Sequence, residues 1–405
     1  MKVSFEKEKL LATLIPASSI SQVKNTMVTV GGLLFECPAD EKFGKVNDDE
    51  EGCARISAYD LEKGIRTTVP CRIYEPGNCV INASRILQIV RVLPDGEITI
   101  EVDDKQRAVI TGGQARYTIS VSPADDFPAM PMFIGDKKYE LPQYAVRTLI
   151  SRVIFAVAQN DQRANLNGAY MKVKDGVLTM VGCDGSRLSL ASYELEKEAD
   201  EAGIIIPGKF LGELMRILRD SEDETTVIIG RKHVIFKVDR IYFFTRLIES
   251  NYMDYERIFP KTYATEAYFD PAEIRDALER AAIISEDKLG GNNKAIVKLE
   301  FAGGEITISC VSSEGSSVEK VTAAIGGEDL TIGFTGRYLL EALKACPENV
   351  SRIRFRLNSA VEGVCIENGE GSRFLNFEGE EKKEKKEEDK FDFLHIVMPR
   401  RLNNK

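Results

Sequence analysis

Histidine is scarce in this chain of 405 residues: only His233 and His395 are present, each within an alternating apolar run. Because histidine supplies much of the acid–base catalysis and metal binding in proteins, this shortage weighs against a common hydrolase. The eight cysteines include no CxxC pair and no spacing typical of a zinc site or a disulfide framework. We therefore expect reduced, mostly buried thiols, no metal and no cofactor.

Long apolar runs are also missing. No stretch approaches the roughly 20 apolar residues that a membrane-spanning helix needs, and the charged run 6–9 interrupts any apolar segment of a signal peptide. We expect a cytoplasmic protein without membrane contact. The net charge of −10 argues against a basic coat over the whole surface, although a sum does not show where the charges lie.

The sequence repeats an apolar frame whose residues are separated by gaps of five and then four positions. The copies are Phe5/Leu10/Leu14, Leu141/Val146/Ile150 and Phe269/Ile274/Leu278, followed by Ile81/Ile86/Val90, Ile205/Phe210/Leu214 and a weaker copy at Tyr338 and Ala342. Each frame opens a segment of helical period. Alternating runs at 97–102, 225–229 and 352–357 follow the second set and predict strands.

The spacing of these frames predicts three similar α+β domains, each made of two helix-then-strands half-units. The predicted domains are residues 1–133, 134–261 and 262–405. Proline-containing segments at 127–131 and 259–260 fit the two linkers. We interpret the acidic segment 39–52 as an enlarged hairpin loop and the mixed-charge segment 378–390 as a loop before the final strand.

Positive charge recurs at equivalent positions of the predicted helices, although the chain is acidic overall. The second helices align Arg85 with Lys209 and Arg337, and Arg91 with Arg216 and Lys344, while the first helices align Arg147 with Arg275 and Arg152 with Arg280. If the half-units surround a common axis, these faces converge on a positive surface that suits duplex DNA. Contacts to phosphate alone carry no sequence code. The alternative is that each face is an ordinary solvated one.

Several segments, in this order and on top of the threefold repeat, resemble the bacterial replicative sliding clamp, the beta subunit of DNA polymerase III. They are 58–62, 64–66, 124–128, 165–168, 183–188, 212–216, 254–260, 280–285 and 397–399. The resemblance implies a fold of the DNA-clamp type, with two helices and two antiparallel sheets in each domain. It also implies a noncatalytic, head-to-tail homodimeric ring that encircles duplex DNA and tethers the polymerase.

The resemblance assigns residues to the ring seam and to DNA. At the seam it implies Arg116, Tyr117 and Ile119 of the first domain against Ile283 and Ile284 of the third, with only Glu314 and Glu319 kept in a loop that is often more acidic. For DNA it adds Lys24, Asn160 and Arg163. Ala164 and Asn165 replace aromatic residues of some relatives, so stacking on an exposed base is not expected.

The resemblance further implies an apolar cleft for short motifs of the DNA polymerase III alpha subunit, the clamp loader and repair proteins. Its matching residues are Leu166, Cys183, Gly185, Ser186, Arg187, Leu188, Met253, Arg257, Ile258, Val364, Ile396, Val397, Met398, Pro399, Arg400, Arg401 and Leu402. Met253 replaces a common proline, Arg400 replaces an apolar residue, and residues 403–405 extend past the usual end. Motif preference is therefore expected to differ.

Other interpretations remain open on the residues alone. The C-terminal apolar run reads as an edge strand, the apolar seam residues as buried within their own domain, and the whole chain as a repeat-built scaffold that binds only proteins. The segment Gly203–Lys209 matches the first part of a phosphate-binding loop, but Phe210 stands where Ser or Thr would hold magnesium. We therefore do not expect an NTPase.

Overall fold

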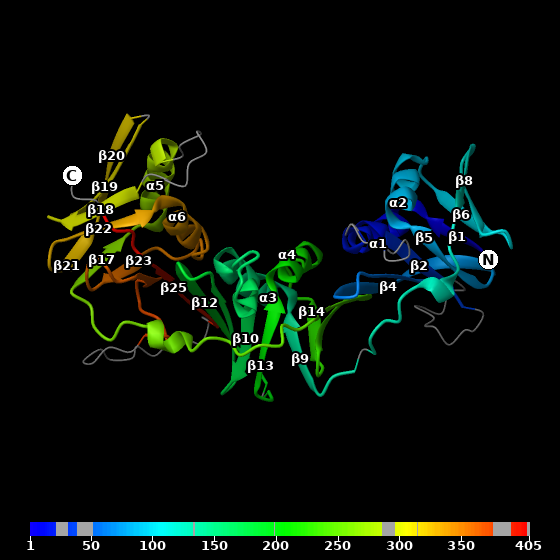
Figure 1. Cartoon of the computed structure of the whole chain (residues 1–405), viewed down its shortest axis with the longest axis horizontal. Coiled ribbons are helices and arrows are strands. Elements are labelled where there is room, and N and C mark those ends of the chain that lie inside the picture. The colour runs from blue at the N-terminus through cyan, green and yellow to red at the C-terminus, as the bar shows by residue number, and fades with distance from the viewer. Residues whose placement is uncertain are drawn as a thin grey trace. The chain divides into compact units, whose positions relative to one another are not determined.

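A computed structural model describes residues 1–21, 31–38, 52–132, 134–197, 199–285, 296–313, 315–375 and 390–402 (Figure 1). Contacts divide the chain into two compact units. Unit 1 comprises Met1–Gln143 and Arg216–Leu247, and unit 2 comprises Tyr144–Met215 and Ile248–Lys405. None of the described helices is long and apolar enough to cross a membrane.

Unit 1 contains two helices and a twelve-stranded antiparallel sheet. Its elements are β1 (Lys2–Glu6), α1 (Lys7–Ile20), β2 (Gly32–Cys37), β3 (Gly52–Tyr59), β4 (Lys63–Glu75), β5 (Gly77–Asn82), α2 (Ala83–Val92), β6 (Glu97–Val102), β7 (Arg107–Gly112), β8 (Ala115–Ser120), the 3₁₀ helix η2 (Ala124–Asp126), β9 (Lys137–Pro142), β14 (Glu224–Ile229), β15 (His233–Val238) and β16 (Ile241–Arg246). The main path of the sheet is β8-β7-β6-β1-β4-β16-β15-β14-β9. Pairing of β4 with β16, where Ile65 lies opposite Phe243, joins the first and middle thirds of the chain.

Unit 2 contains a nine-stranded and a four-stranded sheet. Its elements are α3 (Gln143–Val153), η3 (Ile154–Ala156), η4 (Ala164–Asn167), β10 (Gly168–Lys174), β11 (Val177–Cys183), β12 (Arg187–Glu194), β13 (Ala202–Pro207), α4 (Gly208–Ile217), η5 (Tyr255–Ile258), β17 (Thr265–Phe269), α5 (Pro271–Ser285), β18 (Ile296–Ala302), β19 (Glu305–Ser312), β20 (Gly315–Thr322), β21 (Ala324–Gly327), β22 (Leu330–Thr335), α6 (Gly336–Lys344), β23 (Ile353–Leu357), β24 (Val364–Asn368) and β25 (Phe391–Val397). The division between the units cuts α3 and α4 near one end.

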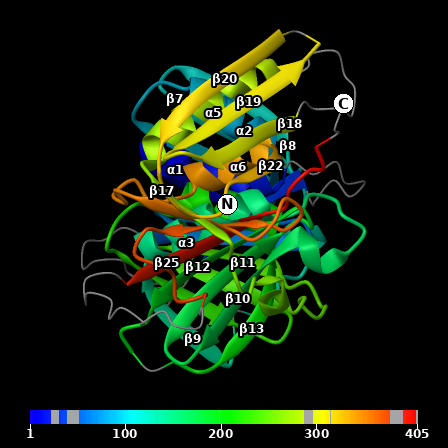
Figure 2. The same ribbon diagram turned by 90° about the vertical axis from the view of Figure 1, so that its left-hand side faces the viewer.

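The two sheets of unit 2 have separate strand orders. The larger runs β13-β10-β11-β12-β25-β24-β23-β17-β21 and the smaller β20-β19-β18-β22. Figure 2 shows the smaller sheet with α5 behind it. Pairing of β12 with β25, from Arg187 opposite Val397 to Tyr193 opposite Phe391, joins the middle third of the chain to the last.

The predicted repeat is confirmed in the order of elements. Each frame opens one of six helices, α1 to α6, and strands β6, β14 and β23 follow the second helix of each third, within one residue of the predicted runs. The segment Gly203–Lys209 is the end of β13 running directly into α4, so it forms no phosphate-binding loop. All eight cysteines are buried and none of them forms a disulfide, as expected.

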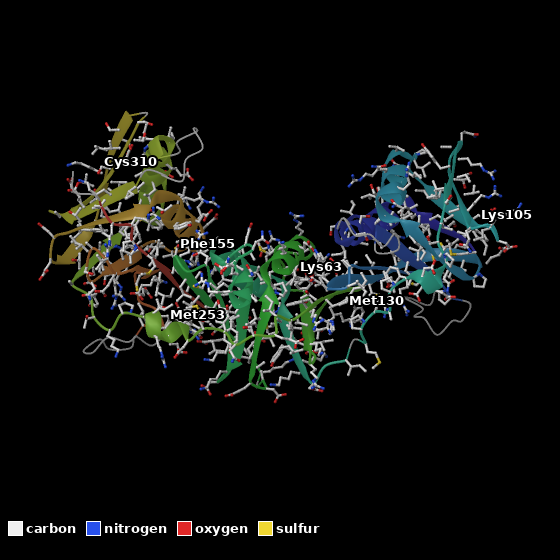
Figure 3. The ribbon with its side chains drawn as sticks, in the orientation of Figure 1. Lys63, Lys105, Met130, Phe155, Met253 and Cys310 are labelled. Atoms are coloured by element: carbon white, nitrogen blue, oxygen red, sulfur yellow. The ribbon has the colours of Figure 1, made fainter. Side chains whose placement is uncertain are left out.

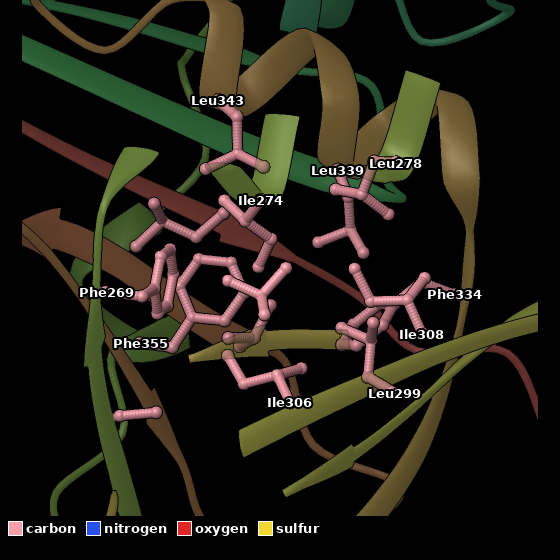
Figure 4. Packing of buried hydrophobic residues seen from close by; sticks show 14 of the residues in the cluster. Phe269, Ile274, Leu278, Leu299, Ile306, Ile308, Phe334, Leu339, Leu343 and Phe355 are labelled. Atoms are coloured by element: carbon pink, nitrogen blue, oxygen red, sulfur yellow. The ribbon is translucent and has the colours of Figure 1, made fainter. Parts of the chain in front are cut away.

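The core of the last third shows how the apolar frames work. Ile274 and Leu278 on α5, one helical turn apart, and Leu339 and Leu343 on α6 point toward the strands below (Figure 4). Phe269 of β17 and Phe355 of β23 meet edge to face with ring centroids 4.7 Å apart. This packing uses the apolar side of each helix and leaves the polar side exposed.

Two predicted segments fall mainly outside the described residues. Of the acidic segment 39–52, the structure describes only Gly52, the first residue of β3, and β3 pairs with β2 as in a hairpin. Of the segment 378–390, it describes only Lys390, which directly precedes β25.

The interpretation of the C-terminal apolar run as an edge strand is wrong. Strand β25 pairs with β12 on one side and with β24 on the other, so it lies inside the nine-stranded sheet. Six of its seven residues are buried. A strand hydrogen-bonded on both sides and covered on both faces is apolar throughout, and that composition alone does not distinguish it from an edge.

His395 lies in the middle of β25 and is fully buried. Its Nδ1 donates to Ser189 Oγ at 2.7 Å, because that hydroxyl itself donates to the carbonyl of Arg152. The imidazole packs against Phe155 and Phe393. Burial, and to a smaller extent the charge of Arg152, lowers the pKa of His395 from 6.5 to about 3.

We therefore expect stability to fall with pH in the window between 6.5 and about 3. The unfolded chain binds a proton there that the folded chain does not, so this contribution is complete above 6.5 and is lost on acidification, by roughly 4 kcal/mol across the window. The measurement is urea unfolding at successive pH values. The His395→Gln variant should show a clearly shallower dependence. His233→Gln alters a half-buried histidine whose pKa burial also lowers, but less than that of His395, so it should change the slope less.

Candidate functional site

The second helices present their cations to solvent. Each begins at the end of a strand, and in α2 the start is fixed by Asn82, whose side chain accepts a hydrogen bond from the amide of Arg85 at 2.9 Å. The exposed cations on these helices are Arg85, Arg91, Lys209, Arg216, Arg337 and Lys344. The three helices thus carry positive charge on the side opposite their buried residues.

These cations differ in whether a carboxylate already pairs with them. Arg337 pairs with Glu341 at 2.8 Å and Lys344 with Glu279 at 2.7 Å. Arg85 and Arg91 have no ion-pair partner among the residues that the structure describes. An arriving phosphate must compete with a carboxylate at the paired positions but not at Arg85 or Arg91.

A second group of candidate residues lies in the turn after η3. Arg163 binds Asp161 through two hydrogen bonds of 3.0 Å, and these lower the pKa of Asp161 to about 2. Asn160 has a positive φ of 60° and accepts a hydrogen bond from Lys209 at 3.5 Å. Asn160 and Lys209, which are 49 positions apart in the sequence, are therefore neighbours.

The first helices behave differently, and one assignment to DNA is corrected. Arg152 is only 7% exposed, because its guanidinium lies 4.9 Å from the ring centre of Phe391 and also faces Phe393. It is therefore not available to phosphate. Arg147 is half-buried and donates to the carbonyl of Met215 at 2.8 Å, and Arg275 is also half-buried. Lys24 lies outside the described residues.

An apolar cluster covers one face of the nine-stranded sheet. Leu166, Cys183, Leu188 and Ile396 are buried in it, with Leu188 directly opposite Ile396 in the pairing of β12 with β25. We call this cluster, with its half-buried members, the docking face. Those half-buried members are Ala158, Tyr170, Tyr252, Met253, Ile258, Phe259, Phe374 and Leu375.

The two faces of β25 carry different groups. Ile396 and Leu394 belong to the docking face together with Met253, whereas His395 packs with Phe155, and Figure 3 labels both Met253 and Phe155. Alternation along strands explains this separation. It also fixes which residues of the neighbouring strand β24 can join the docking face.

Two predicted cleft residues are corrected on this ground. Val364 and Val397, which lie opposite each other, pack into the core of the last third and do not join the docking face. Cys365, opposite Ile396, takes that place. The period of two around Ile396 was a signal that identifies Leu394, whereas Cys365 takes its place through the register of β24 with β25. Sequence reasoning also missed Leu190, Leu394 and Tyr255.

The C-terminal segment passes beside this face. The amide of Met398 donates to the carbonyl of Ser186 at 2.9 Å, and the amide of Arg400 donates to the carbonyl of Gly333 in β22 at 2.7 Å. A Cβ atom at Gly333 would lie 2.9 Å from the backbone oxygen of Arg400, so a larger residue would force this segment to shift. Met398, Arg400 and Arg401 are exposed, Pro399 and Leu402 are half-buried, and residues 403–405 lie outside the described residues.

The turn from Cys183 to Arg187 connects β11 with β12. Gly185 has a φ of +88°, which favours glycine, and the Asp184 carboxylate accepts the amides of Ser186 and Arg187 at 2.8 and 3.0 Å. Asp184 is thus a turn residue. Arg187 is only 7% exposed and does not present its guanidinium to solvent, which corrects its place in the cleft.

Arg257, unlike Arg187, presents its guanidinium to solvent. Its side chain is 84% exposed and pairs with Asp254 at 2.7 Å on η5. A surface pair of this kind contributes little to stability. Arg257 is therefore the available cation beside the docking face, while Arg187 belongs to the structure beneath it.

Two of the strands that end the sheets carry or adjoin residues assigned to the seam. Strand β8 pairs only with β7, and Arg116 and Tyr117 are exposed there while Ile119 is half-buried. Strand β20 pairs only with β19 and contacts α5, on which Ile283 is 73% exposed. Burial of Tyr117 and Ile283 within their own domains is thus excluded, whereas Ile284 is half-buried against the core of the last third.

The acidic residues assigned to the seam need one correction. Glu319 lies on β20, and no loop carries it; its carboxylate accepts two hydrogen bonds from Arg280 of α5, at 3.0 and 2.8 Å. The Glu319 carboxylate therefore already forms an ion pair within its own domain. Glu314 lies outside the described residues. No cluster of histidine, cysteine or acidic side chains that could hold a metal ion occurs in the described part of the chain.

Comparisons with known proteins match all three thirds of the chain to one family. Family models of the N-terminal, central and C-terminal domains of the DNA polymerase III beta subunit match residues 1–131, 140–254 and 256–377. The beta sliding clamp of Staphylococcus epidermidis is 28% identical over 318 residues, which cover 76% of this chain and 83% of that protein.

Solved structures give the same result. The DNA polymerase sliding clamp of Bacillus subtilis has a TM-score of 0.87 and 26% identity, with 99% of both chains covered. That of Pseudomonas aeruginosa has a TM-score of 0.83 and 27% identity, with 99% of this chain and all of that chain covered. The threefold repeat of helices over antiparallel sheets is thus that of a sliding clamp, a noncatalytic processivity factor of DNA replication. The chain belongs to the DNA polymerase III beta subunit family.

Substitution of Arg187 tests whether its side chain belongs to the interior of the protein. Replacing Arg187 by Met removes the cation that pairs with Asp184 and leaves Glu341 with Arg337 alone. We expect a loss of roughly 3–5 kcal/mol in the free energy of unfolding. Denaturant unfolding measures this loss. Arg257→Met is the control and should cost less than about 1 kcal/mol. Equal effects of the two substitutions would contradict the assignment of Arg187 to the interior.

Proposed function

We propose that two copies of this chain close head to tail into a ring that encircles duplex DNA and tethers the replicative polymerase. The observation that carries the proposal is that two edge strands, β8 in unit 1 and β20 in unit 2, have an exposed apolar side chain on or beside them, Tyr117 and Ile283 respectively. An unpaired edge is a template for another strand, and a heterologous contact between unlike ends closes into a ring when the rotation permits.

The seam joins the β8 edge of one copy to β20 and the end of α5 in the other. Tyr117 and the half-buried Ile119 supply apolar surface on one side, and Ile283 supplies it on the other. Arg116 is exposed on β8. Since Glu319 is bound by Arg280, we infer that apolar burial and strand pairing contribute more to this seam than electrostatic attraction.

The DNA contact is sequence-independent and electrostatic. Arg85, Arg91 and Arg216 are its leading contributors because they are exposed and have no ion-pair partner among the described residues. Lys209, Asn160, Arg163, Arg337 and Lys344 form a second group, whose side chains already contact other protein groups. The proposed DNA contacts also include the half-buried Arg147 and Arg275, and Lys24, which the resemblance implies. They no longer include the buried Arg152.

The docking face is the site for short apolar motifs of the DNA polymerase III alpha subunit, the clamp loader and repair proteins. Its support is the exposed Met398 and the half-buried Met253 and Ile258 beside a buried apolar base. Methionine side chains adapt to different apolar partners. Arg257, Arg400 and Arg401 favour motifs with acidic flanks.

The proposal keeps three domains, at residues 1–133, 134–261 and 262–405, although contacts divide the chain into two units. Sheets that continue across domain limits account for the difference, because β4 pairs with β16 and β12 with β25. The ring would work in the cytoplasm, where bacterial DNA is replicated.

Light scattering across a dilution series tests ring closure. The parent protein should have a mass near twice 45.1 kDa, whereas Tyr117→Lys combined with Ile283→Lys places charge in the seam and should give the mass of one chain. Val361→Lys, which alters an apolar side chain of similar exposure outside the seam, should remain a dimer. A parent protein that is monomeric at all concentrations would instead favour a scaffold that binds proteins without encircling DNA.

A further inference from the structure

A line of alternating charges leads from the proposed DNA contact to the docking face within unit 2. It begins at Arg337 on α6, whose side chain is 62% exposed, and continues through Glu341 to Arg187 and Asp184. The last of these residues lies in the turn whose Ser186 holds Met398. The exposed cation and the docking face are therefore connected by direct contacts.

Glu341 divides its carboxylate between two arginines. Its Oε1 accepts from Nε of Arg337 at 2.8 Å, and its Oε2 accepts from Nη1 of Arg187. Burial would raise the pKa of Glu341, but the hydrogen bonds and charges of the two arginines outweigh it, and the pKa is lowered. The group is thus a carboxylate at neutral pH, shared between one exposed and one buried cation.

Arg187 fixes the turn beside the docking face. Its Nε donates to Asp184 at 3.1 Å, its Nη2 donates to the carbonyl of Phe155, and its guanidinium lies 4.5 Å from the ring centre of Tyr338. The same Asp184 carboxylate accepts the turn amides, so a movement of Arg187 is transmitted to Ser186 and to the Met398 amide. The strength of the pair Arg187–Glu341 consequently sets how firmly the turn is held.

We propose that Glu341 is a positioning residue that couples phosphate contact at Arg337 to peptide affinity at the docking face. A DNA phosphate that draws the donors of Arg337 leaves the Glu341 carboxylate to Arg187 alone. The stronger pair holds the turn in the conformation described here, which lowers the cost of ordering it when a peptide docks. By linkage, a docked peptide increases the affinity for DNA by the same factor. This inference rests on the proposed DNA and peptide contacts.

The probe is the tightest of the short overlapping peptides that tile the DNA polymerase III alpha subunit of the same organism, carrying a fluorescent label. Its dissociation constant for the full-length protein is measured by anisotropy, at constant ionic strength, with and without a saturating short DNA duplex. We expect the duplex to tighten peptide binding by about fivefold, the lower end of ordinary coupling between sites.

Two variants separate the steps. Arg337→Gln frees Glu341 for Arg187, so peptide binding should be tight without DNA and should not respond to the duplex. Glu341→Gln weakens the hold on Arg187, so binding should be weaker than in the parent and equally unresponsive. Lys298→Gln, which removes another exposed cation paired with a carboxylate in the same third of the chain, should keep the parent response.

Several results would overturn the inference. One is a Glu341→Gln protein with the parent affinity and response, and another is an Arg337→Gln protein that responds to the duplex as the parent does; the second remains decisive if Glu341→Gln fails to fold. A parent protein that binds the peptide without any effect of DNA contradicts only this coupling. A parent protein that binds none of the peptides contradicts the proposed docking function, and the coupling with it.

Discussion

Pairing of strands across the limits of the sequence repeats is the constraint on which the rest of the structure depends. Strand β16 of the middle third completes the sheet of the first third through β4, and β25 at the C-terminal end lies beside β12 of the middle third. Each half-unit would otherwise end in an exposed edge that invites aggregation. Among the edge strands that remain in the described residues, β8 carries the exposed Tyr117, and β20 contacts α5, which carries the exposed Ile283.

The same sheets determine where function can lie. A helix that covers a sheet uses its apolar side for the core, as Leu339 and Leu343 of α6 do, and leaves its other side for cations such as Arg337. One face of the nine-stranded sheet is covered by the apolar docking face, and half-buried residues such as Met253 and Ile258 lie at its border. The cation-bearing side of the helix and the apolar docking face are thus two consequences of one layered arrangement, and Glu341 contacts both Arg337 and Arg187.

Local periodicity was sufficient to predict the helices and the strands that follow them. Apolar residues at helical spacing, such as Ile274 and Leu278, identify the buried side of a helix from the sequence alone. Local periodicity could not predict contacts between distant segments. Arg152 and Arg280 share a position in the repeat, yet Arg280 is exposed and Arg152 is buried because Phe391 and Phe393 of the last strand lie over it. The interior place of β25 depends on β12, about two hundred residues away, and no local pattern reports that pairing.

The central claim, closure around DNA, is tested most directly by topology. The protein is loaded onto a nicked circular plasmid by the clamp loader of the same organism, and the fraction retained on DNA after gel filtration is measured before and after the plasmid is cut once. A ring that encircles DNA stays on the circle and slides off the ends of the linear form, since its phosphate contacts hold no particular site. Equal retention on both forms would mean that the protein binds DNA without encircling it, and would contradict this account.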